Sequence, residues 1–100
     1  KKFGLRAPMV GHLGDGNFHV LLPYNPKKKE TYENIRKFSD LLIEKTLELE
    51  GTITGEHGVG LHKKEYLKKE HADNLPTMKL IKRTMDPNNI MNPGKIFDLN

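Results

Sequence analysis

The stretch His12–His19, which reads His-Leu-Gly-Asp-Gly-Asn-Phe-His, constrains the fold more than any other part of the chain. Its Asp15-Gly16 pair lies between apolar residues, and Asp-Gly in that setting is a strong signal for a two-residue β-hairpin turn. With this pair at the centre of the turn, His12 lies directly opposite His19. Directly opposed side chains share one face of a sheet, with Cβ atoms about 4.5–5.5 Å apart. The stretch therefore predicts two neighbouring imidazoles, which is half of a site for zinc, iron, copper or nickel.

A histidine pair alone is open to two interpretations, because cross-strand pairs also arise without a ligand. A second stretch favours the ligand. Gly51–Gly60 reads Gly-Thr-Ile-Thr-Gly-Glu-His-Gly-Val-Gly, and its four glycines surround the adjacent Glu56 and His57. Glycine permits unusual backbone angles and close approach of the backbone to a ligand. One carboxylate from Glu56 would complete a set of two histidines and one glutamate, and His57 would remain for proton transfer.

The composition sets outer limits on size and function class. One hundred residues with 35% hydrophobic content form one small domain with a modest core, or part of a larger protein. The absence of cysteine excludes disulfides and thiolate chemistry and is compatible with a cytosolic origin. The net charge is +4, but the one basic triplet, Lys27–Lys29, has no interleaved aromatic residues and suits a solvated helix start better than a nucleic-acid surface.

The sequence gives no sign of a membrane segment or a secretion signal. No apolar run approaches the roughly 20 residues that span a bilayer. The start, Lys1–Gly4, lacks the apolar core of a signal peptide and an initiator Met. We therefore expect the chain to begin within a longer protein.

Hydrophobic spacing predicts two strands followed by helices. The strands flank the Asp-Gly turn, over residues 5–13 and 18–23. A helix over 26–50 follows, with Asn25 as its N-cap, Pro26 in its first turn and Gly51 as its C-terminal stop. A stripe of mostly apolar residues recurs at steps of three and four residues and is expected to face the core; its members are Ile35, Phe38, Leu42, Thr46 and Leu49.

The second half of the chain is expected to be loop and helix in alternation. The glycine-rich stretch 51–60 is a loop with a short strand at 52–54 as an option. A short basic helix over 61–70 and a third helix over 75–85 follow, and the third ends before Pro87 because proline disfavours helix at the preceding residue. Residues 88–97 are expected to be irregular. His62 and His71 lie in charged surroundings and are not expected to be ligands.

Three motifs together carry a resemblance to a known family. His12–His19, Gly51–Gly60 and the segment Met91-Asn-Pro-Gly-Lys-Ile-Phe97 occur in the same order in the C-terminal part of FAD-linked oxidases of the vanillyl-alcohol oxidase superfamily. The most similar branch contains D-lactate dehydrogenases, the large subunit of glycolate oxidase and D-2-hydroxyglutarate dehydrogenases. The resemblance covers about residues 5–97. It implies that residues 1–100 are the C-terminal piece of the substrate domain, and that the FAD-binding domain lies outside this chain.

The resemblance implies a role for each matching residue. By this resemblance, His12, His19 and Glu56 would bind a divalent metal, usually zinc. His57 would be the base beside the substrate and the flavin. Cofactor contacts fall to three residues: Asn17, Asn92 and Lys95. A 2-hydroxy acid would be oxidised to a keto acid, with hydride transfer to FAD. Three protein ligands and an open position are typical of a catalytic metal.

One position departs from the family pattern. Several members carry a polar residue, often Asn, two positions after the second histidine and near the substrate carboxylate. Leu21 stands at that position here. This difference argues against a dicarboxylate substrate in particular.

The resemblance also implies an α+β fold: an antiparallel sheet with helices on one face, as the C-terminal part of a ferredoxin-like cap domain. The implied partners are the 2-hydroxy acid and the FAD-binding domain, with an electron-acceptor subunit and a homodimer left open. A cytoplasmic location is expected, with peripheral membrane attachment left open. The competing interpretation is a non-catalytic metal-binding module or assembly subunit. We also expect the isolated 100-residue chain to bind no FAD tightly and to lack activity.

Overall fold

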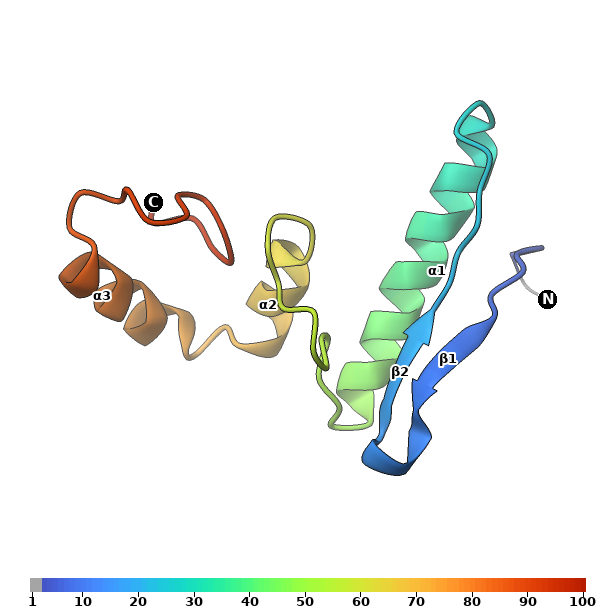
Figure 1. Cartoon of the computed structure of the whole chain (residues 1–100), viewed down its shortest axis with the longest axis horizontal. Helices are drawn as coiled ribbons and strands as arrows, with labels where there is room; N and C mark the ends of the chain where they lie inside the picture. The colour runs from blue at the N-terminus through green and yellow to red at the C-terminus, as the bar shows by residue number, and fades with distance from the viewer. Residues whose placement is uncertain (1–2) are drawn as a thin grey trace. The chain divides into compact units, whose positions relative to one another are not determined.

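The computed structural model describes residues 3–100 and falls into two compact units that meet in sequence at Glu50 and Gly51. Within the described residues the chain is a small α+β protein with one two-stranded antiparallel sheet and three α-helices (Figure 1). The first unit holds β1 (Met9–His12), the 3-10 turn η1 (Leu13–Asp15), β2 (Asn17–Val20) and α1 (Lys29–Glu48). The second unit holds α2 (Lys64–Glu70) and α3 (Leu75–Met85).

The expected hairpin forms, but its turn and its register differ from the prediction. Met9 pairs with Val20 and His12 pairs with Asn17, so His12 is not directly opposite His19. The connection has four residues, because Leu13–Asp15 form η1 and only Gly16 takes the left-handed conformation, with φ of 71°. The two-residue turn fails because Asp15 stays in the 3-10 turn and does not adopt positive φ. The Gly16 N–H closes the turn on the Leu13 carbonyl at 3.1 Å.

Helix α1 is shorter at both ends than the predicted 26–50. Asn25 does not cap it; its Oδ1 accepts the Lys27 N–H at 3.0 Å, which forms a separate turn before the helix starts at Lys29. At the other end Glu50, with φ of 59°, takes the left-handed position that was expected for Gly51. The predicted stripe is half-buried from Ile35 to Thr46, whereas Leu49 is exposed.

Aromatic contacts connect α1 to the segments around the hairpin. The rings of Phe3 and Phe38 meet edge to face with centroids 6.2 Å apart. The rings of Tyr24 and Tyr32 lie 6.1 Å apart in a tilted arrangement. Such pairs add about 0.5–1.5 kcal/mol each beyond the area they bury. These contacts fix the segments before β1 and after β2 on α1.

The second unit follows the sequence prediction closely in its helices. Helix α3 has the predicted bounds, with Pro76 in its first turn and Asp86 as its C-cap. Helix α2 starts at Lys64, three residues later than predicted, and residues 52–54 form no strand. Among residues 3–100, the buried hydrophobic side chains are Ile53 and Leu67. The core is therefore very small, as the low hydrophobic content predicted.

No helix in residues 3–100 is long and apolar enough to cross a membrane.

Candidate functional site

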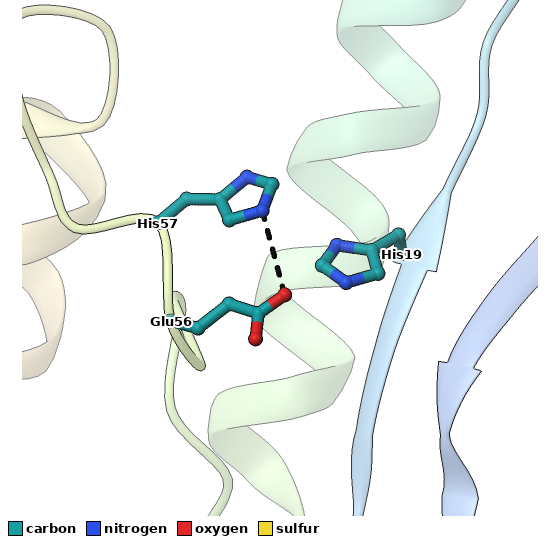
Figure 2. Close-up of side chains that lie close together, drawn as sticks. All are labelled: His19, Glu56 and His57. Carbon is teal, nitrogen blue, oxygen red and sulfur yellow. Dashed lines mark ion pairs between the residues drawn. The ribbon is translucent and has the colours of Figure 1, made fainter.

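The two candidate metal-binding histidines lie on the hairpin of the first unit. Val10 pairs with His19 and His12 pairs with Asn17, so His12 and His19 are diagonal neighbours on the same face of the sheet. Diagonal residues are about 7–8 Å apart, which long side chains can still bridge. His12 is exposed and His19, which projects from β2 (Figure 2), is half-buried. The same-face prediction is therefore confirmed, although direct opposition was wrong.

Glu56 and His57 lie on the loop that opens the second unit. Their side chains approach each other, with His57 Nε2 3.4 Å from Glu56 Oε1 (Figure 2). In an extended segment adjacent side chains would point to opposite sides, but residues 55–57 bend, and this bend brings the two side chains together. The exposed fractions of the two side chains are 46% for Glu56 and 69% for His57, so both are accessible from solvent.

Three contacts hold this loop in place. Ile53 is 6% exposed and anchors the start of the loop. The Ile53 N–H donates to Oε2 of Glu70, at the end of α2, at 3.0 Å. The Thr54 hydroxyl donates to the Gly58 carbonyl at 3.1 Å and closes the loop around Glu56 and His57. The sequence did not predict this role of Glu70, because a carboxylate in a run of charged residues gives no sign that it accepts a hydrogen bond from the backbone.

Asn92 and Lys95 lie on one turn of the C-terminal segment. The Lys95 N–H donates to the Asn92 carbonyl at 3.2 Å. Pro93 and Gly94, with φ of 72° at Gly94, stand at the central positions that a type II turn requires. Asn92 and Lys95 line a cavity of about 350 Å³ together with Lys82 of α3. The turn therefore presents both residues beside one concave surface.

A carboxylate and two lysines hold this segment to the helices. Asp86 is 5% exposed and accepts the N–H groups of Ile90 at 3.0 Å and Met91 at 2.9 Å. A hydrogen bond from Lys82, helped by those from Met91 and Ile90, lowers the pKa of Asp86 below its usual range, against the opposite effect of burial. At the other end, Lys64 Nζ donates to the Gly94 carbonyl at 3.2 Å and pairs with Asp98 at 2.6 Å.

The remaining residues singled out in the sequence lie on the hairpin and on either side of α2. Asn17 begins β2 opposite His12 and is half-buried. Leu21 is 50% exposed, and its N–H donates to the Pro8 carbonyl at 2.9 Å, which continues the hairpin ladder. His62 is exposed, and His71 Nε2 lies 3.4 Å from Glu70 Oε1. The two histidines and Glu56 belong to different units, so the convergence of the three stays a prediction.

Residues 1–96 match the family described as FAD linked oxidases, C-terminal domain. The chain is 44% identical over 94 residues to "D-lactate dehydrogenase [cytochrome], mitochondrial" of Arabidopsis thaliana, which covers 93% of this chain and 17% of that protein. It is 41% identical over 97 residues to "Glycolate oxidase subunit GlcD" of Bacillus subtilis, covering 96% and 21% of the two chains. It is 40% identical over 90 residues to "D-2-hydroxyglutarate dehydrogenase" of Stutzerimonas stutzeri, covering 87% and 19%. The chain thus spans about a fifth of the length of these relatives.

Proposed function

Because this chain belongs to the family of C-terminal domains of FAD-linked oxidases, we propose that it is the substrate-side piece of a flavin-dependent 2-hydroxy-acid dehydrogenase. The observation that supports this is that the three sequence motifs fall on one hairpin and on two loops held by hydrogen bonds, with their candidate site residues exposed or half-buried. The relatives named above are called dehydrogenases or oxidases of D-lactate, glycolate and D-2-hydroxyglutarate. Of these, D-lactate and glycolate are the proposed substrates, because Leu21 offers no polar group for a second carboxylate.

The donor chemistry suits a divalent metal. Two imidazoles, those of His12 and His19, share a face of the hairpin, and Glu56 offers a carboxylate. A set of two His and one Glu is a known catalytic zinc set, which leaves a position open for substrate. When bound, the metal would supply Lewis-acid polarisation of the substrate hydroxyl, and the flavin would supply a hydride acceptor.

The residues of the chain then divide the remaining work. His57 takes the hydroxyl proton at an imidazole nitrogen, a step for which histidine suits neutral pH. The 3.4 Å approach of Glu56 to His57 Nε2 orients that ring. Asn17, Asn92 and Lys95 face the cofactor in this proposal. A ferredoxin-like arrangement would be completed by chain outside residues 1–100.

The direct test uses the full-length protein that contains this sequence. Anaerobic addition of D-lactate or glycolate should bleach the flavin, and 2-hydroxyglutarate should do so more slowly. His19→Ala should lose both the bound zinc and the bleaching, while the matched control His62→Ala, at an exposed histidine, should keep both. Bound zinc without any flavin reduction would instead favour a non-catalytic metal-binding module.

A further inference from the structure

The segment after α3 has an unusual backbone. Four residues between 89 and 96 have positive φ: Asn89 at 50°, Asn92 at 48°, Gly94 at 72° and Ile96 at 69°. Positive φ is costly for a β-branched residue such as Ile96. Such conformations persist only where the surroundings determine them, and they gather at functional sites. Contacts with the rest of the unit must therefore impose this backbone shape.

Asp86 and Lys82 fix the entry to the segment. The Asp86 carbonyl accepts the Asn89 N–H at 3.0 Å and so closes a turn through Pro87. Its carboxylate then accepts the next two N–H groups, from Ile90 and Met91. Lys82 donates to the same carboxylate and also to the Met91 carbonyl. The Met91 residue is thus bound at both its N–H and its carbonyl, directly before Asn92.

The exit from the segment is fixed separately. The Ile96 N–H donates to the Gly60 carbonyl at 2.8 Å, and the Phe97 N–H donates to the Lys95 carbonyl at 2.8 Å. Lys64 binds the Gly94 carbonyl from α2. These hydrogen bonds are made to backbone groups of the segment. They therefore fix the positions of Asn92 and Lys95 without involving either side chain. Asn92 and Lys95 both line the cavity that Lys82 also lines.

We propose that Asp86, acting with Lys82, is a positioning residue that sets the place of Asn92 against the flavin. This inference rests on the proposed function, which makes Asn92 a cofactor contact. Asp86 touches no reacting group, and its effect passes through the Met91 peptide. Asp86→Asn keeps the shape and one acceptor oxygen but loses the charge and the second acceptor. The loop entry should then shift while α3 remains folded.

The test is a double-mutant cycle in the full-length protein with Asp86→Asn, Asn92→Ala and the combination. A misplacement of about 1 Å can cost about 10²-fold in rate. We expect each single variant to slow flavin reduction about 10- to 100-fold, and the double variant to be no slower than Asn92→Ala alone. Asp73→Asn is the matched control, because it makes the same chemical change at an exposed residue of the same unit. Lys82→Met should reproduce the Asp86→Asn effect and covers the case in which Asp86→Asn does not fold.

Two readouts separate this inference from the proposed function. Flavin reduction by 2-hydroxy acids tests the function, whereas the visible flavin spectrum of the purified variants needs no substrate. Spectra that change alike in Asp86→Asn, Lys82→Met and Asn92→Ala, but not in Asp73→Asn, support the positioning role even if no 2-hydroxy acid is oxidised. Independent, multiplying effects in the double variant, or wild-type rates and spectra in both Asp86→Asn and Lys82→Met, would overturn it.

Discussion

Gly11 is the position at which a single methyl group should do most damage to the hairpin. It pairs with Phe18 in the centre of the sheet and has φ of 157°. A Cβ added there would lie 2.5 Å from the Asn17 carbonyl oxygen and 2.5 Å from the Phe18 Cα. Both contacts are with backbone of the partner strand, so no side chain can move aside to relieve them.

The magnitude follows from two costs. Overpacking costs about 1–3 kcal/mol, and a residue held in a sparsely populated backbone region costs about 1–3 kcal/mol more. A two-stranded hairpin is only marginally stable by itself. We therefore expect Gly11→Ala to disrupt the pairing of β1 with β2. His12 and His19 would lose their common face, and about 1.4 kcal/mol already corresponds to a tenfold change in affinity, so zinc affinity should fall at least about tenfold.

The assay compares Gly11→Ala with Gly14→Ala in the full-length protein. A Cβ at Gly14 meets nothing within 4 Å, so this variant should keep the wild-type melting temperature and metal content. Amide hydrogen exchange of residues 17–20 reads the hairpin directly, and metal analysis reads the site. Wild-type exchange protection in Gly11→Ala would refute the structural reasoning. Lost protection with full metal content would refute the assignment of His12 and His19 as ligands.

Three further predictions concern the candidate site and the segment after α3. His57→Ala in the full-length enzyme should lower turnover by roughly 10²–10⁴-fold with little change in flavin or zinc content; loss of the metal with the side chain would show that His57 is a ligand and not the base. The isolated 100-residue chain should purify without flavin, and a yellow protein with near-stoichiometric flavin absorbance would contradict this. The pKa of Asp86 is lowered in the folded protein, so its contribution to stability is present above the unfolded pKa of about 3.9 and is lost as the pH falls through the folded pKa. The amide chemical shifts of Ile90 and Met91 should therefore titrate with a midpoint below a pH of about 3.9. A midpoint at or above that unfolded pKa would contradict the hydrogen bonds assigned to the Asp86 carboxylate.

The helices could be predicted from the sequence because their signals are local. Helix α3 is bounded by Pro76 and by Asp86 before Pro87, and both effects act within one turn. The hairpin could be predicted only in part, because the Asp-Gly signal fixes a reversal of the chain and not the length of the loop. The partner of His12 moves by two positions, from His19 to Asn17. A shift of two positions keeps every side chain on its face, so the two histidines share a face of the sheet although the predicted register was wrong.

The ties that hold the loops could not be predicted by the same means. Glu70 binds the Ile53 N–H from 17 residues away, and no periodicity reports a contact of that range. Asp86 did carry a usable sign, since Asp followed by Pro is typical of the first two positions of a type I turn. That sign predicts the turn at 86–89 but not the two further N–H groups that the carboxylate accepts.

The small core explains why the second unit depends on such ties. Ile53 and Leu67 are its buried hydrophobic side chains within the described residues, too few to determine the shape of two long loops by packing. Glu70, Asp86 and Lys64 instead bind backbone N–H and carbonyl groups of those loops. Backbone partners are indifferent to the side chains of the residues they hold. The loops can therefore keep their shape whichever side chains they carry. The residue types at Glu56, His57, Asn92 and Lys95 are then set by the chemistry of the site and not by the packing of the loops.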